Sequence, residues 1–209
     1  MKAIILGATG LVGSKLLSKL VYDSRFAEVI SFSRRPLDLT HPKLKQIISP
    51  LKDFDHGQEL FHEVDALFCC IGTTIKKAGS QKAFKAVDYD LPLLAAQVFK
   101  QHQGKHFLII TAVGSDPGSP FFYNKTKGQL EQALKDLNLK RLSLIKPSLL
   151  LGERADSRFF EGLGQIIFPI LNPLIPGKYK AVSAEDVAET LLQTSLCQNC
   201  KNDILVETF

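Results

Sequence analysis

The 209-residue chain is 45% hydrophobic and 22% charged, which is typical of a globular protein and excludes extensive disorder. No stretch reaches the roughly 18 apolar residues of a membrane-spanning helix, and the apolar start MKAIIL is followed by no cleavage site for a signal peptide. The net charge of +5 comes from scattered lysines and arginines, which indicates a solvated surface and argues against nucleic acid as a partner. We expect a cytosolic protein with one domain over residues 1–209.

Strand-like and helix-like segments alternate along the chain. Apolar runs of strand length predict β-strands over residues 2–6, 28–32, 45–49, 65–70, 106–110, 141–145 and 203–207. Apolar residues at three- and four-residue spacing predict helices over residues 11–22, 81–102, 121–136 and 184–195. The strand-like runs are continuously apolar, as in a sheet covered on both faces. We therefore predict an α/β fold, a doubly wound and mostly parallel sheet of Rossmann type with a small C-terminal subregion.

The turn after the first predicted strand is rich in glycine. Gly7, Gly10 and Gly13 follow the spacing G-x-x-G-x-x-G rather than the G-x-G-x-x-G of the usual dinucleotide fingerprint. Glycines at such a turn let backbone N–H groups approach a pyrophosphate at the positive end of the next helix. The pattern predicts a dinucleotide site, and its alternative is a purely structural turn.

The end of the second predicted strand indicates which dinucleotide binds. A carboxylate there would hold the ribose 2′-hydroxyl of NAD, whereas an arginine suits the 2′-phosphate of NADP. The sequence reads ISFSRRP, with Arg34 and Arg35 and no carboxylate. A guanidinium makes paired, charge-assisted hydrogen bonds to phosphate. We predict NADP(H) in preference to NAD, the alternative being that one or both arginines point into solvent.

Tyr123 and Lys127 are four residues apart in a predicted helix, so both side chains can face one ligand. Free tyrosine has a pKa near ~10, and a nearby ammonium is expected to lower that pKa. The phenol can then give a proton to a carbonyl oxygen while hydride arrives from a cofactor. The preceding strand ends in hydroxyl-bearing residues, Thr111 and Ser115, which adds weight to the pair.

Prolines mark two places in the second half of the chain. Ser119 followed by Pro120 predicts the start of the helix over 121–136, with Ser119 as its N-cap. Residues 147–180 are rich in proline and in apolar side chains, and they are too interrupted to span a membrane. We expect this segment to pack on the carboxyl edge of the sheet, either as loops and a short helix or as an apolar wall flanking the substrate site.

Cysteine usage indicates no metal site. Cys69 and Cys70 lie inside an apolar run, where cysteine acts as a small core residue. Cys197 and Cys200 form one C-x-x-C pair, and no second pair completes a zinc site.

These motifs together resemble the short-chain dehydrogenase/reductase superfamily. More narrowly, the chain is similar to the atypical branch typified by the Tat-interacting protein family of NADPH-binding oxidoreductases. The matching stretches run in order from residue 4 to about residue 158 and are GATGLVG, SRRP, FCCIGTT, KHFLIITAVGSD, YNKTKGQLE and KPSLLLGERADSR.

The resemblance implies a site at defined positions of this chain. Its cofactor-binding residues are Gly7, Thr9, Gly10, Leu11, Val12, Gly13, Arg34, Arg35, Ile71, Gly72, Thr73, Lys127, Leu150 and Arg158. It makes Tyr123 the proton donor, and it assigns Lys127 to hold the nicotinamide ribose and to acidify Tyr123. The superfamily's usual catalytic serine is missing, and Thr111 is the residue expected to replace it. Its usual relay asparagine is also missing, and Asp88 or a neighbour takes that position.

Two classes of function remain open from the sequence. The first is an NADP(H)-dependent oxidoreductase that acts on a small carbonyl or alcohol, with Tyr123, Lys127 and Thr111 as its catalytic residues. The second is an NADPH-binding regulatory or scaffold protein with little or no turnover, which would engage a protein partner. A homodimer is compatible with both.

Overall fold

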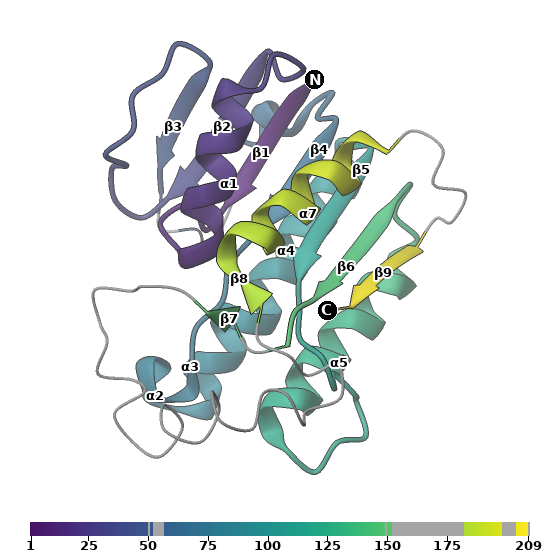
Figure 1. Ribbon diagram of the computed structural model, residues 1–209. Helices are drawn as coiled ribbons and strands as arrows, with labels where there is room; N and C mark the ends of the chain where they lie inside the picture. Colours follow the sequence, from purple (N-terminus) through teal and green to yellow (C-terminus); the bar gives the residue numbers. More distant parts are fainter. Residues whose placement is uncertain (50, 52–56, 149, 152–181, 198–203, 209) are drawn as a thin grey trace.

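A seven-stranded parallel sheet forms the centre of the protein in the computed structural model (Figure 1). The structure describes residues 1–49, 51, 57–148, 150–151, 182–197 and 204–208. The strands lie in the order β3-β2-β1-β4-β5-β6-β9, and every neighbouring pair is parallel. Their bounds are Lys2–Leu6 (β1), Glu28–Ser33 (β2), Leu44–Ile48 (β3), Ala66–Cys69 (β4), His106–Ile110 (β5), Leu142–Lys146 (β6) and Ile204–Thr208 (β9). The predicted doubly wound, parallel Rossmann-type sheet is confirmed.

Helices cover both faces of this sheet, as the continuously apolar strands require (Figure 1). Helices α1 (Leu11–Tyr22) and α7 (Ala184–Leu196) pack on one face, around Ile5, Phe68 and Leu108. Helices α4 (Leu91–Gln101) and α5 (Phe122–Asp136) pack on the other, around Ile4, Leu67 and Ile109. Residues 3–6 of the central strand β1 are 0% exposed. The sheet therefore separates two core layers, one on each of its faces.

The strands that follow β1 in the chain lie on both sides of it, and this arrangement places a crevice at the carboxyl edge of the sheet. The first connection leads to β2 on one side of β1, and a later one brings β4 to its other side. Open α/β sheets bind ligands where the strand order reverses in this way. The glycine turn, which follows β1, lies at this point.

The predicted helix over 81–102 consists of three consecutive pieces. Helix α3 (Gln81–Lys85) passes into a π-helical turn η2 (Ala86–Asp90) and then into α4, which ends at Gln101. A short helix α2 (Ile75–Ala78) precedes them, and a 3₁₀ turn η1 (Gln58–Phe61) precedes β4. A small two-stranded sheet, β7 (Leu150–Leu151) with β8 (Val182–Ser183), completes the described elements. The predicted apolar segment 147–180 lies mostly outside the described residues.

The predicted N-cap of α5 is wrong. The helix begins at Phe122, and Phe121 occupies the N-cap position. The Ser119 hydroxyl accepts a hydrogen bond from the Phe121 N–H at 3.2 Å, two residues along the chain and ahead of the helix. The hydroxyl therefore closes a local turn.

Candidate functional site

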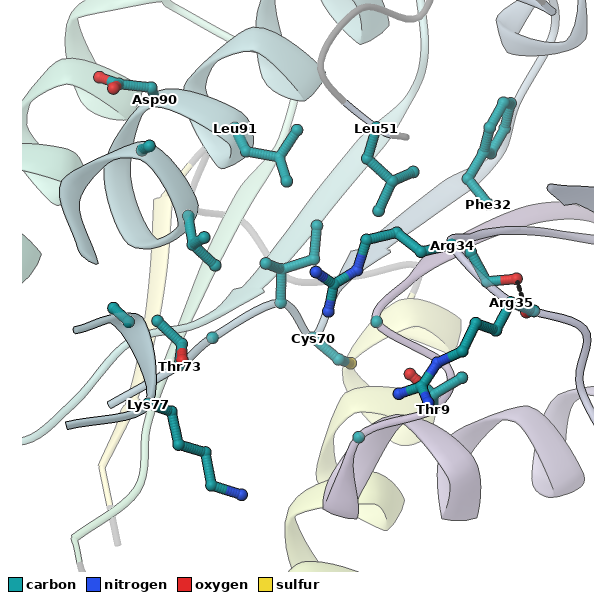
Figure 2. A pocket seen from close by; sticks show the side chains of 18 of the residues that line it. Thr9, Phe32, Arg34, Arg35, Leu51, Cys70, Thr73, Lys77, Asp90 and Leu91 are labelled. Carbon is teal, nitrogen blue, oxygen red and sulfur yellow. Dashed lines mark hydrogen bonds between the residues drawn. The ribbon is translucent and has the colours of Figure 1, made fainter. Parts of the chain in front are cut away.

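A cleft of about 1140 Å³ opens at the carboxyl ends of β1, β2 and β4 (Figure 2). Its floor is the glycine turn, one side carries the end of β2, and the opposite side is formed by the segment from residue 71 to α4. The lining residues are Gly7, Thr9, Gly10, Leu11, Ser14, Phe32, Ser33, Arg34, Arg35, Leu51, Cys70, Ile71, Gly72, Thr73, Lys77, Ala78, Ala83, Ala86, Val87, Asp90, Leu91 and Leu94. The cleft thus combines a backbone-rich floor, a cationic rim and an apolar far wall.

The glycine turn is too tight for side chains at two positions. Gly7 has φ +83°, and a Cβ on it would lie 2.6 Å from the Cys70 carbonyl oxygen. A Cβ on Gly13 would lie 2.2 Å from the Gly7 carbonyl oxygen, so α1 packs directly on the turn. Helix α1 starts after Gly10, and among the described residues no side chain caps its N-terminus. Its first N–H groups are therefore available to an anion.

Arg34 and Arg35 stand on the rim of the cleft, directly after β2. Both are exposed, and neither forms an ion pair with a described residue. In Figure 2 the Arg35 guanidinium lies beside Thr9, and that of Arg34 extends across the cleft above Cys70. The Ser33 hydroxyl donates to the Arg35 carbonyl oxygen at 2.7 Å and fixes the backbone of this turn. Two guanidinium groups therefore face the end of the cleft where the sequence predicts a phosphate.

Most predicted cofactor residues line this one cleft, and the others divide into three groups. Val12 and Gly13 are buried in the first turn of α1, beneath the lining. Lys127 is buried behind the cleft wall. Leu150 belongs to β7, but its side chain lies outside the described part of the chain, as does all of Arg158.

The apolar far wall of the cleft was not predicted from the sequence. Ala83, Ala86 and Val87 come from α3 and the π-helical turn, and Leu91 and Leu94 come from α4. The only signal in the sequence was the apolar periodicity of residues 81–102, which does not say which face meets a ligand.

Lys127 forms a buried ion pair with Asp88. Its Nζ lies 2.7 Å from Asp88 Oδ1, and the two side chains are 5% and 1% exposed. The other carboxylate oxygen of Asp88 accepts a hydrogen bond from the Thr73 N–H at 2.8 Å. Because Thr73 lines the cleft, Asp88 links Lys127 on α5 to the wall of the cleft.

Tyr123 lies one helical turn before Lys127 and is half-buried. Its ring packs against Phe84, with 5.7 Å between the ring centroids. Burial raises the pKa of the Tyr123 phenol, and the opposing effect of Lys127 is itself countered by Asp88. The pKa of Tyr123 therefore lies above its ordinary value because of burial, although Lys127 itself acts to lower it. Burial lowers the pKa of Lys127, but the adjacent Asp88 carboxylate together with Tyr123 outweighs burial, so that pKa is raised and the ammonium stays charged.

Thr111 follows β5 directly and is 4% exposed. Its Oγ1 is buried and has no hydrogen-bond partner among the described residues. Side chains alternate between sheet faces, and Ile109 faces α5, so Thr111 belongs to the same face as Lys127. The Ser115 hydroxyl donates to the Ala112 carbonyl oxygen at 2.7 Å, which leaves Thr111 as the better candidate for a substrate contact.

The described residues were also searched for a reactive cysteine and for a metal site. Burial raises the pKa of the Cys69 thiol to about 12, so it is not a nucleophile near neutral pH. No cluster of three or more metal-binding side chains occurs within the part of the chain that the structure describes. In the same part, no helix has the length and hydropathy needed to cross a membrane.

Comparison with known families and proteins identifies the group to which the chain is related. The HIM1 family matches residues 43–165, more than half of the chain. The chain belongs to the HIM1 family. The protein HTATIP2 of Rattus norvegicus is 35% identical over 167 residues, covering 78% of this chain and 69% of the relative. The protein FMP52 of Meyerozyma guilliermondii is 33% identical over 201 residues, covering 94% and 86%. The resemblance to the Tat-interacting protein family is confirmed.

Solved structures share the fold of this HIM1-family chain. MoeE5 in complex with UDP-glucose and NAD superimposes with a TM-score of 0.75 at 14% identity, over 99% of this chain and 75% of MoeE5. A short chain dehydrogenase family protein from Francisella tularensis gives a TM-score of 0.69 at 15% identity, over 99% and 96%. At such identities the likeness establishes the Rossmann-type fold and no shared reaction.

The expected cytosolic location is contradicted by the relatives. The FMP52 proteins of Meyerozyma guilliermondii, Candida albicans and Debaryomyces hansenii are named as mitochondrial. These names point away from the cytosol, and the prediction from composition is wrong.

Proposed function

We propose that the protein is an NADP(H)-dependent oxidoreductase of the short-chain dehydrogenase/reductase type, which transfers hydride to or from a small carbonyl or alcohol. One observation carries this proposal. A cleft with a glycine floor and two arginines on its rim is connected, through Thr73 and Asp88, to a lysine one helical turn from a half-buried tyrosine. A nucleotide site is thereby joined to a proton donor.

The shape and charge of the cleft suit a dinucleotide with a 2′-phosphate. The N-terminus of α1 and the close approach allowed at Gly7 suit a pyrophosphate. Arg34 and Arg35 offer two guanidinium groups at the end of β2, where NAD-binding sites place a carboxylate. Bound in this cleft, NADPH would supply the hydride. MoeE5, which shares the fold, was solved in complex with UDP-glucose and NAD, so the proposed preference for NADP(H) rests on these two arginines.

The protein's own side chains would then handle the proton. Tyr123 gives its phenolic proton to the carbonyl oxygen as the alcohol forms. Lys127 orients Tyr123 and the nicotinamide ribose. The unpartnered Oγ1 of Thr111 donates to the substrate oxygen, which supplies the hydrogen bond that this buried hydroxyl lacks.

The test is Tyr123→Phe, which removes the phenolic oxygen and keeps the ring packed on Phe84. We expect kcat to fall by about 10²- to 10⁴-fold, the usual contribution of a general acid. NADPH affinity, measured by fluorescence titration, stays within about twofold, since Tyr123 is absent from the cleft lining. The matched control is Tyr22→Phe, at a tyrosine that is 71% exposed. If Tyr123→Phe turned over a panel of carbonyl substrates as fast as the parent protein, Tyr123 would not be the proton donor.

The second candidate is an NADPH-binding regulatory or scaffold protein with little or no turnover. It is favoured by the threonine that replaces the usual serine and by the carboxylate that offsets the charge of Lys127. Under this candidate NADPH binds, no carbonyl on the panel is reduced by the unmodified protein, and cofactor binding alters association with a second copy or another protein. The same titration and panel separate the two functions.

A further inference from the structure

The segment that joins β4 to α4 is strongly basic. Residues 71–87 contain four lysines and no aspartate or glutamate, and the lysines are Lys76, Lys77, Lys82 and Lys85. All four residues are exposed. The next carboxylate along the chain, Asp88, is buried against Lys127 at 2.7 Å and does not offset their charge. The segment therefore gives a positive potential to the cleft wall that lies opposite the arginines.

Lys77 is the lysine of this segment that lines the cleft. It belongs to the short helix α2, and the Thr74 hydroxyl caps this helix by accepting the Lys77 N–H at 3.1 Å. Figure 2 shows Lys77 on the same side of the cleft as Thr73, whereas the carboxylate of the lining residue Asp90 points away from it. An ammonium group with three N–H donors is thus presented at this wall.

The wall that carries Lys77 is packed on the start of the helix that bears the proposed proton donor. Phe84 of α3 is 0% exposed, and its ring centroid lies 5.7 Å from those of Phe122 and Tyr123 on α5. Arg34 and Arg35 stand on the opposite rim, where the 2′-phosphate is expected. Lys77 therefore belongs to the reaction end of the cleft.

There is space for a substrate beside Lys77. The neighbouring lining residues on this wall, Ala78, Ala83 and Ala86, have small side chains. The cleft of about 1140 Å³ also exceeds the ~300–1,000 Å³ of most small-molecule sites. A second molecule can thus lie next to a cofactor, between the glycine floor and the alanines.

We propose that Lys77 binds an anionic group of the substrate, so that the carbonyl or alcohol compound carries a carboxylate or a phosphate. The inference rests on the proposed function, because the cofactor and Tyr123 define the reaction end of the cleft. Either anion accepts charge-assisted hydrogen bonds from the Lys77 ammonium, and the exposed lysines around it attract the anion from solvent. The pyrophosphate of the cofactor has its own donors at the N-terminus of α1.

The experiment measures the binding of matched ketones to the full-length protein, with saturating NADP⁺ and again without nucleotide, by isothermal titration calorimetry. The aromatic probes are para-acetylbenzoate, para-acetylphenyl phosphate and the neutral methyl para-acetylbenzoate. Levulinate and methyl levulinate form an aliphatic pair. We expect an anion to bind about tenfold more tightly than its neutral partner, the usual scale for a hydrogen bond to a charged group. Equal binding of anionic and neutral probes in both sets overturns the inference.

Three variants assign the preference to Lys77. Lys77→Met should abolish the preference for the anion, and Lys77→Arg, which keeps the charge, should retain it. Lys82→Met is the matched control, because Lys82 is an exposed lysine of the same segment that is absent from the cleft lining. A preference that survives Lys77→Met, or that Lys82→Met also abolishes, overturns the inference.

Two further outcomes separate this inference from other roles of the cleft. If Lys77→Met weakened NADPH binding about tenfold in the fluorescence titration, Lys77 would hold a phosphate of the cofactor, and the inference would be wrong. The calorimetric readout needs no turnover. An anion preference that depends on Lys77, with no ketone reduced, would therefore count against the proposed function and leave the anion site in place.

Discussion

His106 lies at the start of β5 and is 3% exposed, with Nε2 2.8 Å from the Ser143 hydroxyl on β6. Burial lowers the pKa of its imidazole from 6.5 to about 3, and nearby Arg141 adds to the shift. The folded protein therefore keeps His106 neutral at a pH where the unfolded chain protonates it. Such a group links stability to pH even though it is far from the candidate site.

The sign of this linkage gives a prediction. Between pH 6.5 and about 3 the unfolded chain binds a proton at His106 and the folded chain does not. The free energy of unfolding must then fall as pH falls, by up to ~1.4 kcal/mol per pH unit. Glutamine at this position can still hydrogen-bond Ser143 but does not titrate. Urea denaturation at about pH 7 and about pH 5 should show a smaller loss for His106→Gln than for the parent; equal losses would contradict the prediction.

At the same scale, the sequence predicted that Tyr123 and Lys127 lie on one helix, but not the direction in which the pKa of Tyr123 shifts. The spacing of Tyr123 and Lys127 was enough to place them on one face of a helix. The direction of the Tyr123 pKa was missed because it depends on burial and on Asp88, which is 35 positions before Tyr123 in the chain. Local spacing carries no information on either quantity.

Helix starts provide the prediction at the scale of elements. The Ser183 hydroxyl caps α7, accepting the Asp186 N–H at 3.0 Å and donating to the Asp186 carboxylate at 2.7 Å. Ser183→Ala should lower the free energy of unfolding by about 1 kcal/mol. Ser119→Ala is its matched control, since Ser119 stands outside α5 and its loss should cost less than ~0.5 kcal/mol. If urea denaturation gave equal losses in the free energy of unfolding for the two variants, the Ser183 side chain would not stabilise α7 as a helix cap.

Elements were predicted well where burial and period agree. Every predicted strand lies within one residue of the observed one, because each is a short apolar run bounded by turns. Helix α1 has its predicted limits, Leu11–Tyr22. The single helix predicted over 81–102 hid the π-helical turn, since one extra residue in a turn barely disturbs a pattern of period 3.6. That turn carries Asp88, the partner of Lys127, so this side chain lies in a segment whose backbone could not be predicted from the sequence.

At the scale of the molecule, strand order explains why distant segments share one site. The glycine turn after β1, the arginines after β2 and Thr73 after β4 all follow parallel strands, so they meet at the same edge of the sheet. This could be predicted from the alternation of strands and helices alone. Cellular location could not, because receptors read targeting signals that a folded core does not require.

Cofactor preference can be tested on the stability of the whole molecule, without any substrate. A ligand at about 100 times its Kd stabilises the folded state by ~2.7 kcal/mol, and for a chain of this size that raises Tm by about 5–10 °C. We expect this shift with NADPH and a smaller one with NADH, because only the former presents a 2′-phosphate to Arg34 and Arg35. Replacing both arginines by alanine should bring the NADPH shift down to that of NADH. Arg25→Ala, at an arginine paired with Asp23 and absent from the cleft lining, should keep the full difference. Equal shifts with the two nucleotides in the parent protein would mean that the rim arginines do not read the phosphate, and NAD would become the better candidate.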